Sequence, residues 1–182
     1  MVLTATHYTP IPIQNKPTVT DLIDDHGTML YRFCRSITYS KEDAEDLFQE
    51  TWVTILQRPL KLEMIKTPQS FLCRETLSIW KSKQRKYARR KRLAPEAPLD
   101  AEIDSGQDVE SEMLQKAEKE FVRQSVDKLP DKYRIPIILY YNAEMDIADI
   151  SQTLNIPLGT VKSRLFNARQ IIKKEVQKYE KS

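Results

Sequence analysis

The chain has 182 residues, of which 30% are charged, and its formal net charge is +3 at pH 7. This length allows one domain or two small ones, and a content of only three glycines disfavours an all-β fold and a glycine-rich phosphate-binding loop. The sequence has no run of about twenty apolar residues, and its N-terminus lacks a charged segment followed by an apolar one. We therefore expect neither membrane insertion nor a secretory signal.

The cysteines and histidines give no sign of a metal site. Cys34 and Cys73 lie inside helical patterns, and with His7 and His26 they do not have the spacing of metal ligands. We expect two buried free thiols in a reducing cytoplasm, with a disulfide as the less favoured alternative. No metal or cofactor is expected.

The first predicted elements are a tail and two helices. Residues 1–18 contain three prolines and little periodicity, which predicts a flexible tail. Apolar spacing predicts a helix from about 20 to 38, and Ser40 then resembles an N-cap, with Asp43 in a capping-box position. The helix that Ser40 opens is predicted to reach Gln57, and its buried side would be formed by Ala44, Leu47, Phe48, Thr51 and Ile55.

A loop over 59–67 leads into a third helix, with Thr67 as its cap and Pro68 in its first turn. This helix continues into residues 81–92, where Lys and Arg occupy all faces and leave no apolar side to pack in a core. A solvated helix end is the ordinary interpretation, but such a dense charge favours a polyanionic partner. The neighbouring aromatic residues Trp80 and Tyr87 could stack on unpaired bases, although core packing is the favoured interpretation for Trp80.

The second helix carries an acidic face. Asp43, Asp46 and Glu50 lie at i, i+3 and i+7, with Gln49 at the edge. A solvated face is the ordinary interpretation, and a metal site is disfavoured because no histidine or second acidic cluster converges on it. A protein-docking surface fits better, since this face would repel the nucleic acid that the basic helix attracts.

Residues 94–112 are acidic and rich in linker residues, so they predict a flexible connection between two domains, 19–93 and 113–182. In the second domain we expect a helix from Met113 to Leu129, closed by Pro130, and another helix over about 132–142 that Asp131 caps. No segment shows sustained strand alternation, so the predicted fold is all-α, with two small helical domains.

The last two predicted helices have helix-turn-helix dimensions. Asp146, with Asp149 three residues on, opens a short helix to Leu154, and Asn155 forms the turn because Asn tolerates the left-handed conformation. The final helix extends to about Lys178. Its inward positions are Val161, Leu165, Ala168 and Ile172, and its outward positions are Lys162, Ser163, Phe166 and Asn167.

The outward side chains combine a cation, a hydroxyl, an aromatic ring and an amide, which are typical readers of base edges in the major groove. An ordinary helical hairpin has the same apolar pattern and remains the alternative on that pattern alone. The polar outer face and the nearby cations favour DNA.

Three segments in this order resemble one family: DAEDLFQETW at 43–52, LPDKYR at 129–134 and GTVKSRL at 159–165. They are similar to bacterial sigma factors of the extracytoplasmic function group. The resemblance implies a non-catalytic cytoplasmic protein that binds core RNA polymerase and directs it to promoters. It also implies an anti-sigma factor as a partner, and a monomer when the protein is free.

The resemblance assigns three sets of residues. Docking on the clamp coiled coil of the largest polymerase subunit is implied for Asp43, Asp46, Gln49 and Glu50. Opening and capture of the −10 element is implied for the loop 59–67 and the helix after it, with Lys61, Lys66, Ser78, Trp80, Lys81, Lys83, Arg85, Lys86 and Arg89. Reading of the −35 element is implied for Arg134, Gly159, Thr160, Lys162, Ser163, Arg164, Phe166 and Asn167, of which Arg134, Gly159 and Thr160 would lie near phosphates.

The chain departs from the family pattern at several positions. Ser78 and Ser82 stand where many members have Asn and Asp, and Glu144 and Asn155 stand where Gly is usual.

Three other classes of protein fit the sequence less well. A conventional helix-turn-helix regulator would need neither the acidic face nor the basic helix. An enzyme is disfavoured because the sequence shows no nucleophile–base pair, glycine-rich loop or clustered metal ligands. A structural helical bundle would leave both the basic run and the polar face of the last helix unexplained.

Overall fold

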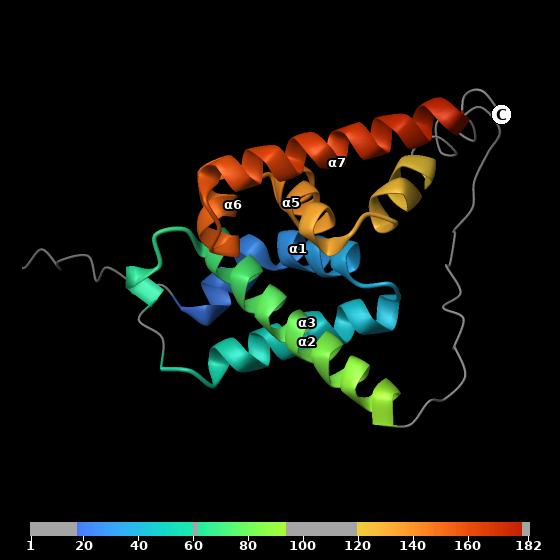
Figure 1. The fold of residues 1–182 in the computed structure, drawn as a ribbon. Helices are drawn as coiled ribbons and strands as arrows, with labels where there is room; N and C mark the ends of the chain where they lie inside the picture. The colour runs from blue at the N-terminus through green and yellow to red at the C-terminus, as the bar shows by residue number, and fades with distance from the viewer. Residues whose placement is uncertain (1–17, 60–61, 94–119, 180–182) are drawn as a thin grey trace, which may run out of the picture.

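The computed structural model describes residues 18–59, 62–93 and 120–179. Over these ranges the regular structure is helical throughout, without a strand, so the predicted all-α fold is confirmed. The helices form two groups, one from residues 18–93 and one from residues 120–179 (Figure 1). The predicted tail and most of the predicted linker lie outside the described residues.

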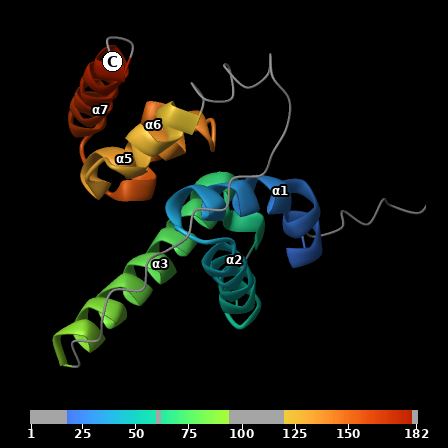
Figure 2. The same cartoon turned by 90° about the vertical axis from the view of Figure 1, so that its right-hand side faces the viewer.

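The first group consists of α1 (Val19–Ile37), α2 (Lys41–Leu56), the short 3-10 helix η1 (Leu62–Met64) and α3 (Pro68–Leu93). The three long helices pack pairwise on one another. The C-terminal half of α3 extends beyond the other helices as a free arm (Figure 2). This arm contains residues 81–92, which we call the basic arm.

Side-chain caps fix where the first two helices begin. The Asp43 amide donates to Ser40 Oγ over 3.0 Å, which confirms Ser40 as an N-cap, but the reciprocal bond of a capping box is not among the contacts of the described residues. The complete box lies one helix earlier. There the Asp21 amide donates to Thr18 Oγ1 over 3.2 Å, and the Thr18 amide donates to Asp21 Oδ2 over 2.7 Å.

The core of the first group includes one aromatic residue that was not predicted to be buried, Trp52. Trp52 is buried, and Phe48, predicted as buried, is only half-buried. The Phe48 ring packs edge-on against Trp52 and Tyr31, with centroid distances of 6.1 and 5.7 Å. This edge-to-face geometry is favourable for aromatic pairs, so the half-exposed ring closes one side of the core.

Cys34 and Cys73 are free and buried, as predicted. Burial raises the pKa of each thiol to about 12, from 9.0 in an exposed cysteine. Because the thiolate is the reactive form, we expect labelling by a thiol reagent at pH 8 to be about a thousandfold slower in the folded chain than in denaturant. Mass spectrometry after timed labelling measures this, and rapid labelling of either cysteine in the native chain would contradict it.

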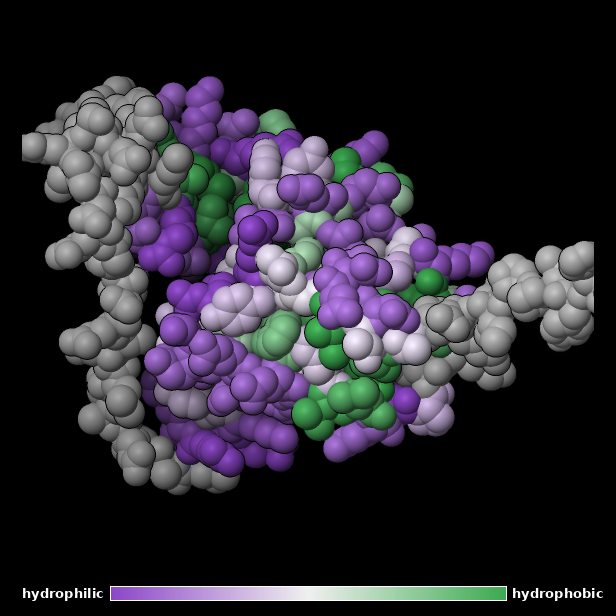
Figure 3. Space-filling view, turned by 180° about the vertical axis from the view of Figure 1, so that it is seen from behind, coloured by the Kyte–Doolittle hydropathy of each residue, from purple (hydrophilic) through white to green (hydrophobic). Residues whose placement is uncertain are grey.

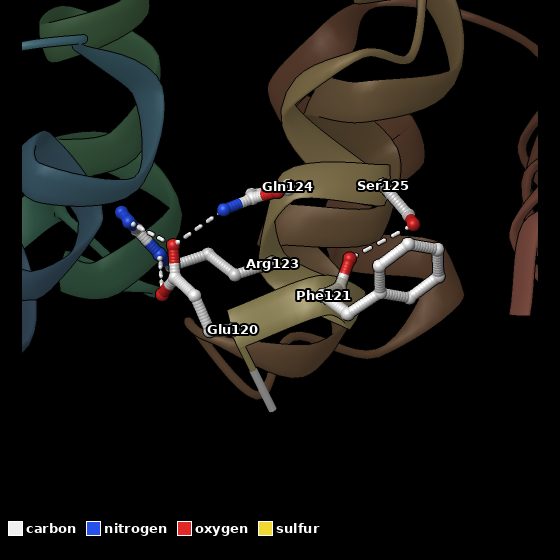
Figure 4. Close-up of polar contacts among 5 residues, drawn as sticks. All are labelled: Glu120, Phe121, Arg123, Gln124 and Ser125. Carbon is white, nitrogen blue, oxygen red and sulfur yellow. Dashed lines mark hydrogen bonds and ion pairs between the residues drawn. The ribbon is translucent and has the colours of Figure 1, made fainter. Parts of the chain in front are cut away.

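The second group consists of a helix over 120–127, α5 (Asp131–Tyr141), α6 (Ile147–Leu154) and α7 (Leu158–Tyr179). In the helix 120–127, Arg123 donates to both carboxylate oxygens of Glu120 over 2.8 and 2.7 Å, and Ser125 Oγ donates to the Phe121 carbonyl (Figure 4). The Phe121 ring stacks on Tyr179 at 4.3 Å, which ties this helix to the end of α7.

The predicted cap of α5 is wrong. The N-cap is Pro130, which makes no side-chain cap bond, and Asp131 is the first helical residue. The pyrrolidine ring fixes the φ angle of proline. Pro130 can therefore precede the first turn of the helix although it has no side-chain acceptor. The Asp131 carboxylate instead accepts a bond from Arg134, one turn along the same helix, over 3.3 Å.

The turn between α6 and α7 follows the prediction closely. Asp146 caps α6 by accepting from the Asp149 amide over 2.7 Å, and Asn155 is left-handed with φ 51°. The Ile156 amide donates to the Ser151 carbonyl over 3.1 Å, and Ser151 Oγ donates to the Ile156 carbonyl over 2.6 Å. Ser151 therefore locks the turn that sets α7 against α6.

Glu144 is the second left-handed residue of the described chain, with φ 50°. A glutamate pays a steric cost in this conformation that glycine avoids. We expect Glu144→Gly to raise the free energy of unfolding by about 0.5–1 kcal/mol, as measured by chemical denaturation. Glu144→Ala serves as the matched control and should give no such gain, because alanine keeps the Cβ atom. Equal effects of the two substitutions would contradict the strain.

Candidate nucleic-acid and polymerase interfaces

The N-terminal half of α7 separates a packing side from an exposed side. Val161, Leu165 and Ala168 are almost completely buried. Four side chains on the other side of the helix are exposed, and we call them the reading face: Lys162, Ser163, Phe166 and Asn167. Phe166 is 60% accessible although it is a large apolar residue. An unpaired aromatic ring beside a cation and an amide suits contact with base edges and thymine methyl groups.

Other residues predicted at the −35 site have mixed placements. Gly159 is exposed at the start of α7, and Thr160 is half-buried and accepts a bond from Ser163 Oγ at its carbonyl over 3.0 Å. Arg164 is half-buried and lines a cleft beside α3. The fourth residue, Arg134, is fully buried between the two helix groups and is not on the surface. Arg134 can make its predicted contact with a DNA phosphate only if the two helix groups move relative to each other.

Arg169 shows what positions α7. Its Nε donates to the Tyr141 hydroxyl over 3.1 Å, and its guanidinium lies 5.2 Å from the Tyr140 ring. These contacts attach α7 to α5 and are typical of an arginine stacked on aromatic faces. The sequence placed Arg169 only among nearby cations, so its packing role is a finding of the structure.

The basic arm presents most of its predicted −10 residues to solvent. The exposed side chains are Lys81, Arg85, Lys86 and Arg89, and Ser78 and Lys66 are exposed nearer the body of the molecule. Lys61 lies outside the described residues. Tyr87 is 63% exposed on the arm, whereas Trp80 at its base is only 5% exposed. Tyr87 is therefore free to stack on a base in this conformation, and Trp80 is not.

The acidic face of α2 is exposed at all four predicted positions: Asp43, Asp46, Gln49 and Glu50. Lys83 on α3 donates to Glu50 over 2.7 Å, so a cation predicted for DNA pairs with an acid predicted for polymerase. Both side chains are more than 40% exposed, and an exposed pair of this kind contributes little to stability. The pair can open without a large cost when either partner is bound.

Two apolar residues extend the acidic face toward the end of α2. Val53 and Leu56 are 50% and 62% exposed, at helical spacing from Gln49. Apolar side chains form green areas within the mainly hydrophilic surface seen in Figure 3. Neither residue was predicted at the site. Both lie outside the buried periodicity of α2, and that periodicity is a usable sequence signal of exposed apolar positions.

The part of the chain that the structure describes offers neither a metal site nor a membrane span. Among the described residues, no cluster of three or more His, Cys, Asp or Glu side chains could hold a metal ion. Within the same ranges, none of the helices combines the length and hydropathy that a bilayer crossing requires.

A helix-turn-helix with an exposed polar reading face, linked to a helical bundle with a basic arm, defines a transcription protein that contacts DNA. The Sigma-70 region 2 family matches residues 22–91, and the Sigma-70 region 4 family matches residues 122–172. The chain belongs to the sigma-70 family, in its extracytoplasmic function group. It is an alternative sigma factor for promoter-specific transcription initiation.

Curated relatives cover most of the chain. It is 25% identical over 170 residues to the ECF RNA polymerase sigma factor SigW of Bacillus subtilis (strain 168), covering 86% of this chain and 88% of the relative. It is 29% identical over 156 residues to SigM of the same organism, covering 86% and 93%. The sequence-based family assignment is thus confirmed.

Solved structures share the fold. The sigma factor RpoE of Bartonella quintana, in complex with the anti-sigma factor NepR, aligns with a TM-score of 0.72 at 21% identity, over 87% of this chain and 98% of that one. CnrH, in complex with the cytosolic domain of CnrY, aligns with a TM-score of 0.59 at 19% identity, over 87% of this chain and 86% of that one.

Proposed function

We propose that the two helix groups divide the work of promoter recognition. Residues 19–93 bind core RNA polymerase and open the −10 element, and residues 113–182 read the −35 element through α7. In this proposal, residues 1–18 are a tail that precedes the first part, and residues 94–112 are a linker that joins the two parts. The observation that carries the proposal is the exposed reading face of α7, directly opposite its buried residues.

Within the first group, the acidic face docks on a basic surface of the polymerase and the basic arm follows the DNA backbone. Exposed carboxylates attract a cationic partner and repel DNA, so the two surfaces would not compete for one ligand. Phosphate contacts by the cations of the arm would offset part of the cost of extruding a base. In this scheme the protein has no catalytic activity of its own, because the polymerase performs the chemistry. The protein acts in the cytoplasm.

An anti-sigma factor is the proposed regulator of the free monomer. A cavity of about 1090 Å³ opens between the end of α1 and the second group. Its apolar residues are Val122, Val126, Ile137, Ile138 and Ile172, and its cations are Arg35, Arg123, Lys128, Arg169 and Lys173. Burial raises the pKa of the Asp127 carboxyl in the same cavity, whereas Arg123 and Arg134 oppose that shift. An amphipathic helix with acidic edges would complement this lining.

Transcription with purified components tests the function. Core RNA polymerase plus this protein is expected to start transcripts at a small set of genomic sites that share upstream elements, and sequencing of transcript 5′ ends identifies them. Core polymerase alone is the control. Binding of the protein to duplex DNA without any association with core polymerase would instead support a conventional helix-turn-helix regulator.

A further inference from the structure

The cleft beside α3, which Arg164 lines, has the size of a small-molecule site. Its volume is about 570 Å³, and its lining residues come from α3 and from the second helix group. Pockets for small ligands usually have volumes of about 300–1,000 Å³. A DNA duplex, whose major groove alone is about 12 Å wide, is too large to enter such a cleft and could touch only its rim.

Positive charge converges on this cleft from several helices. Lys81 and Arg85 come from α3, Lys132 comes from α5 and Arg164 comes from α7. The lining contains a single carboxylate, that of Asp131. None of the four cations forms an ion pair within the described part of the chain. Like charges on one concave surface repel each other, and a bound anion would remove that repulsion.

Apolar side chains supply much of the remaining lining of the cleft. They are Trp80, Ile135, Pro136, Leu154 and Ile156. Small-ligand sites typically combine such apolar walls with a few charged groups that orient the ligand. The lining therefore suits a small anion that also carries an apolar or aromatic part.

Two buried donors beside the cleft have no acceptor in the described structure. Trp80 is 5% exposed, and its Nε1 has no hydrogen-bond partner. Arg134 is fully buried, 5.7 Å from the Trp80 ring, and its Nη2 donates to the Ile37 carbonyl over 3.3 Å, whereas its Nη1 has no partner. Its ion pair is with Asp131, another lining residue. Buried donors without an acceptor are rare in native proteins, so both favour an acceptor supplied from the cleft.

We propose that this cleft binds a small polyphosphate anion, and that the bound anion competes with promoter DNA. Lysine and arginine are the usual protein partners of phosphate, and the several charges of a triphosphate would match the excess of cations. The anion is either inorganic triphosphate or the phosphate chain of a nucleoside triphosphate, whose base would contact the apolar lining. Lys81, Arg85 and Arg164 are also predicted DNA contacts, so the competition, but not the binding, rests on the proposed function.

Calorimetric titration of the full-length protein tests the site. In metal-free buffer, inorganic triphosphate is expected to bind saturably, one anion per chain, at micromolar concentration, and sulfate at the same ionic strength is not. ATP and GTP form a second arm. Tighter binding of either nucleotide would show that the apolar lining contacts the nucleoside, and equal affinity would show that the phosphate chain alone is recognised. The absence of saturable binding by all three compounds would overturn the proposal.

Three substitutions locate the bound anion. Lys132→Ala is expected to weaken triphosphate binding about tenfold, because it removes a charged donor to phosphate. Asp131→Asn is expected to strengthen it about two- to fivefold, because it removes the opposing carboxylate. Lys174→Ala is the matched control, since Lys174 is an exposed lysine of α7 that does not line the cleft. Equal weakening by the two lysine substitutions would show that net charge governs binding, and would overturn the site. All three positions are exposed, and circular dichroism checks the fold.

Duplex binding tests the competition. Triphosphate is expected to displace a dye-labelled duplex that carries an upstream element found by transcript mapping, as measured by anisotropy. Lys132 is not a predicted DNA contact, so Lys132→Ala should bind the duplex normally and require about tenfold more triphosphate for the same displacement. Equal displacement from both proteins, or none at saturating triphosphate, would overturn competition at the cleft and leave the −35 assignment intact. Triphosphate binding by a protein that does not bind the duplex would support the site and count against the proposed function.

Discussion

Asp46→Lys is expected to weaken binding of the protein to core RNA polymerase at least about 30-fold, because reversing one charge in a desolvated interface both removes an attraction and adds a repulsion. Asp46 lies in the middle of the acidic face, fully on the solvent side of α2. Its neighbours Asp43, Gln49 and Glu50 would border the same contact. Titration of labelled core polymerase with the variant measures the loss.

A matched control tests whether polymerase affinity depends on the position of the reversed charge or on the net charge of the protein. Asp25 is an exposed carboxylate on α1, a different helix from the one that carries the acidic face, and Asp25→Lys changes the total charge by the same amount. We expect its polymerase affinity to remain within about twofold of the parent, since exposed charges beyond contact distance are screened by salt. Equal weakening by both variants would show that bulk charge, and not the acidic face, governs docking.

The parts of the fold that the sequence predicted are those fixed by local chemistry. Asp146 caps α6, Asn155 turns left-handed, and the helical period separates Val161 and Leu165 from the reading face. Each of these depends on interactions within a few residues, which a single sequence displays. The cap of α5 was misassigned because Asp131 has the chemistry of a cap, although its carboxylate contacts Arg134.

The contact between the halves could not be predicted in this way. Arg134 and Ile37 are 97 positions apart, and helical periodicity shows which side of a helix is buried but not what buries it. Arginine is also rarely buried, so the residue type predicted an exposed position for Arg134. The pairing of Lys83 with Glu50 was missed for the same reason, because each residue belonged to a surface that was predicted separately.

The double substitution Lys162→Ala and Phe166→Ala is expected to reduce discrimination between a cognate and a scrambled upstream element by about a hundredfold or more, since each good base-edge contact contributes about tenfold or more. Both side chains are exposed and neither belongs to the buried core, so stability should change little. Competition binding with the two duplexes, using the protein in complex with core polymerase, measures the discrimination.

The control for this variant uses the same helix and again replaces one apolar residue and one lysine. Ile171→Ala with Lys174→Ala also removes an exposed apolar side chain and a cation, about one and two turns beyond the reading face, and should leave discrimination unchanged. Polymerase affinity should be the same in both variants, because the proposed docking residues lie on α2. A parallel loss of polymerase affinity and discrimination in the first variant would mean that α7 acts on the polymerase. Loss of discrimination alone would place sequence reading on the exposed face of α7 that carries Lys162 and Phe166.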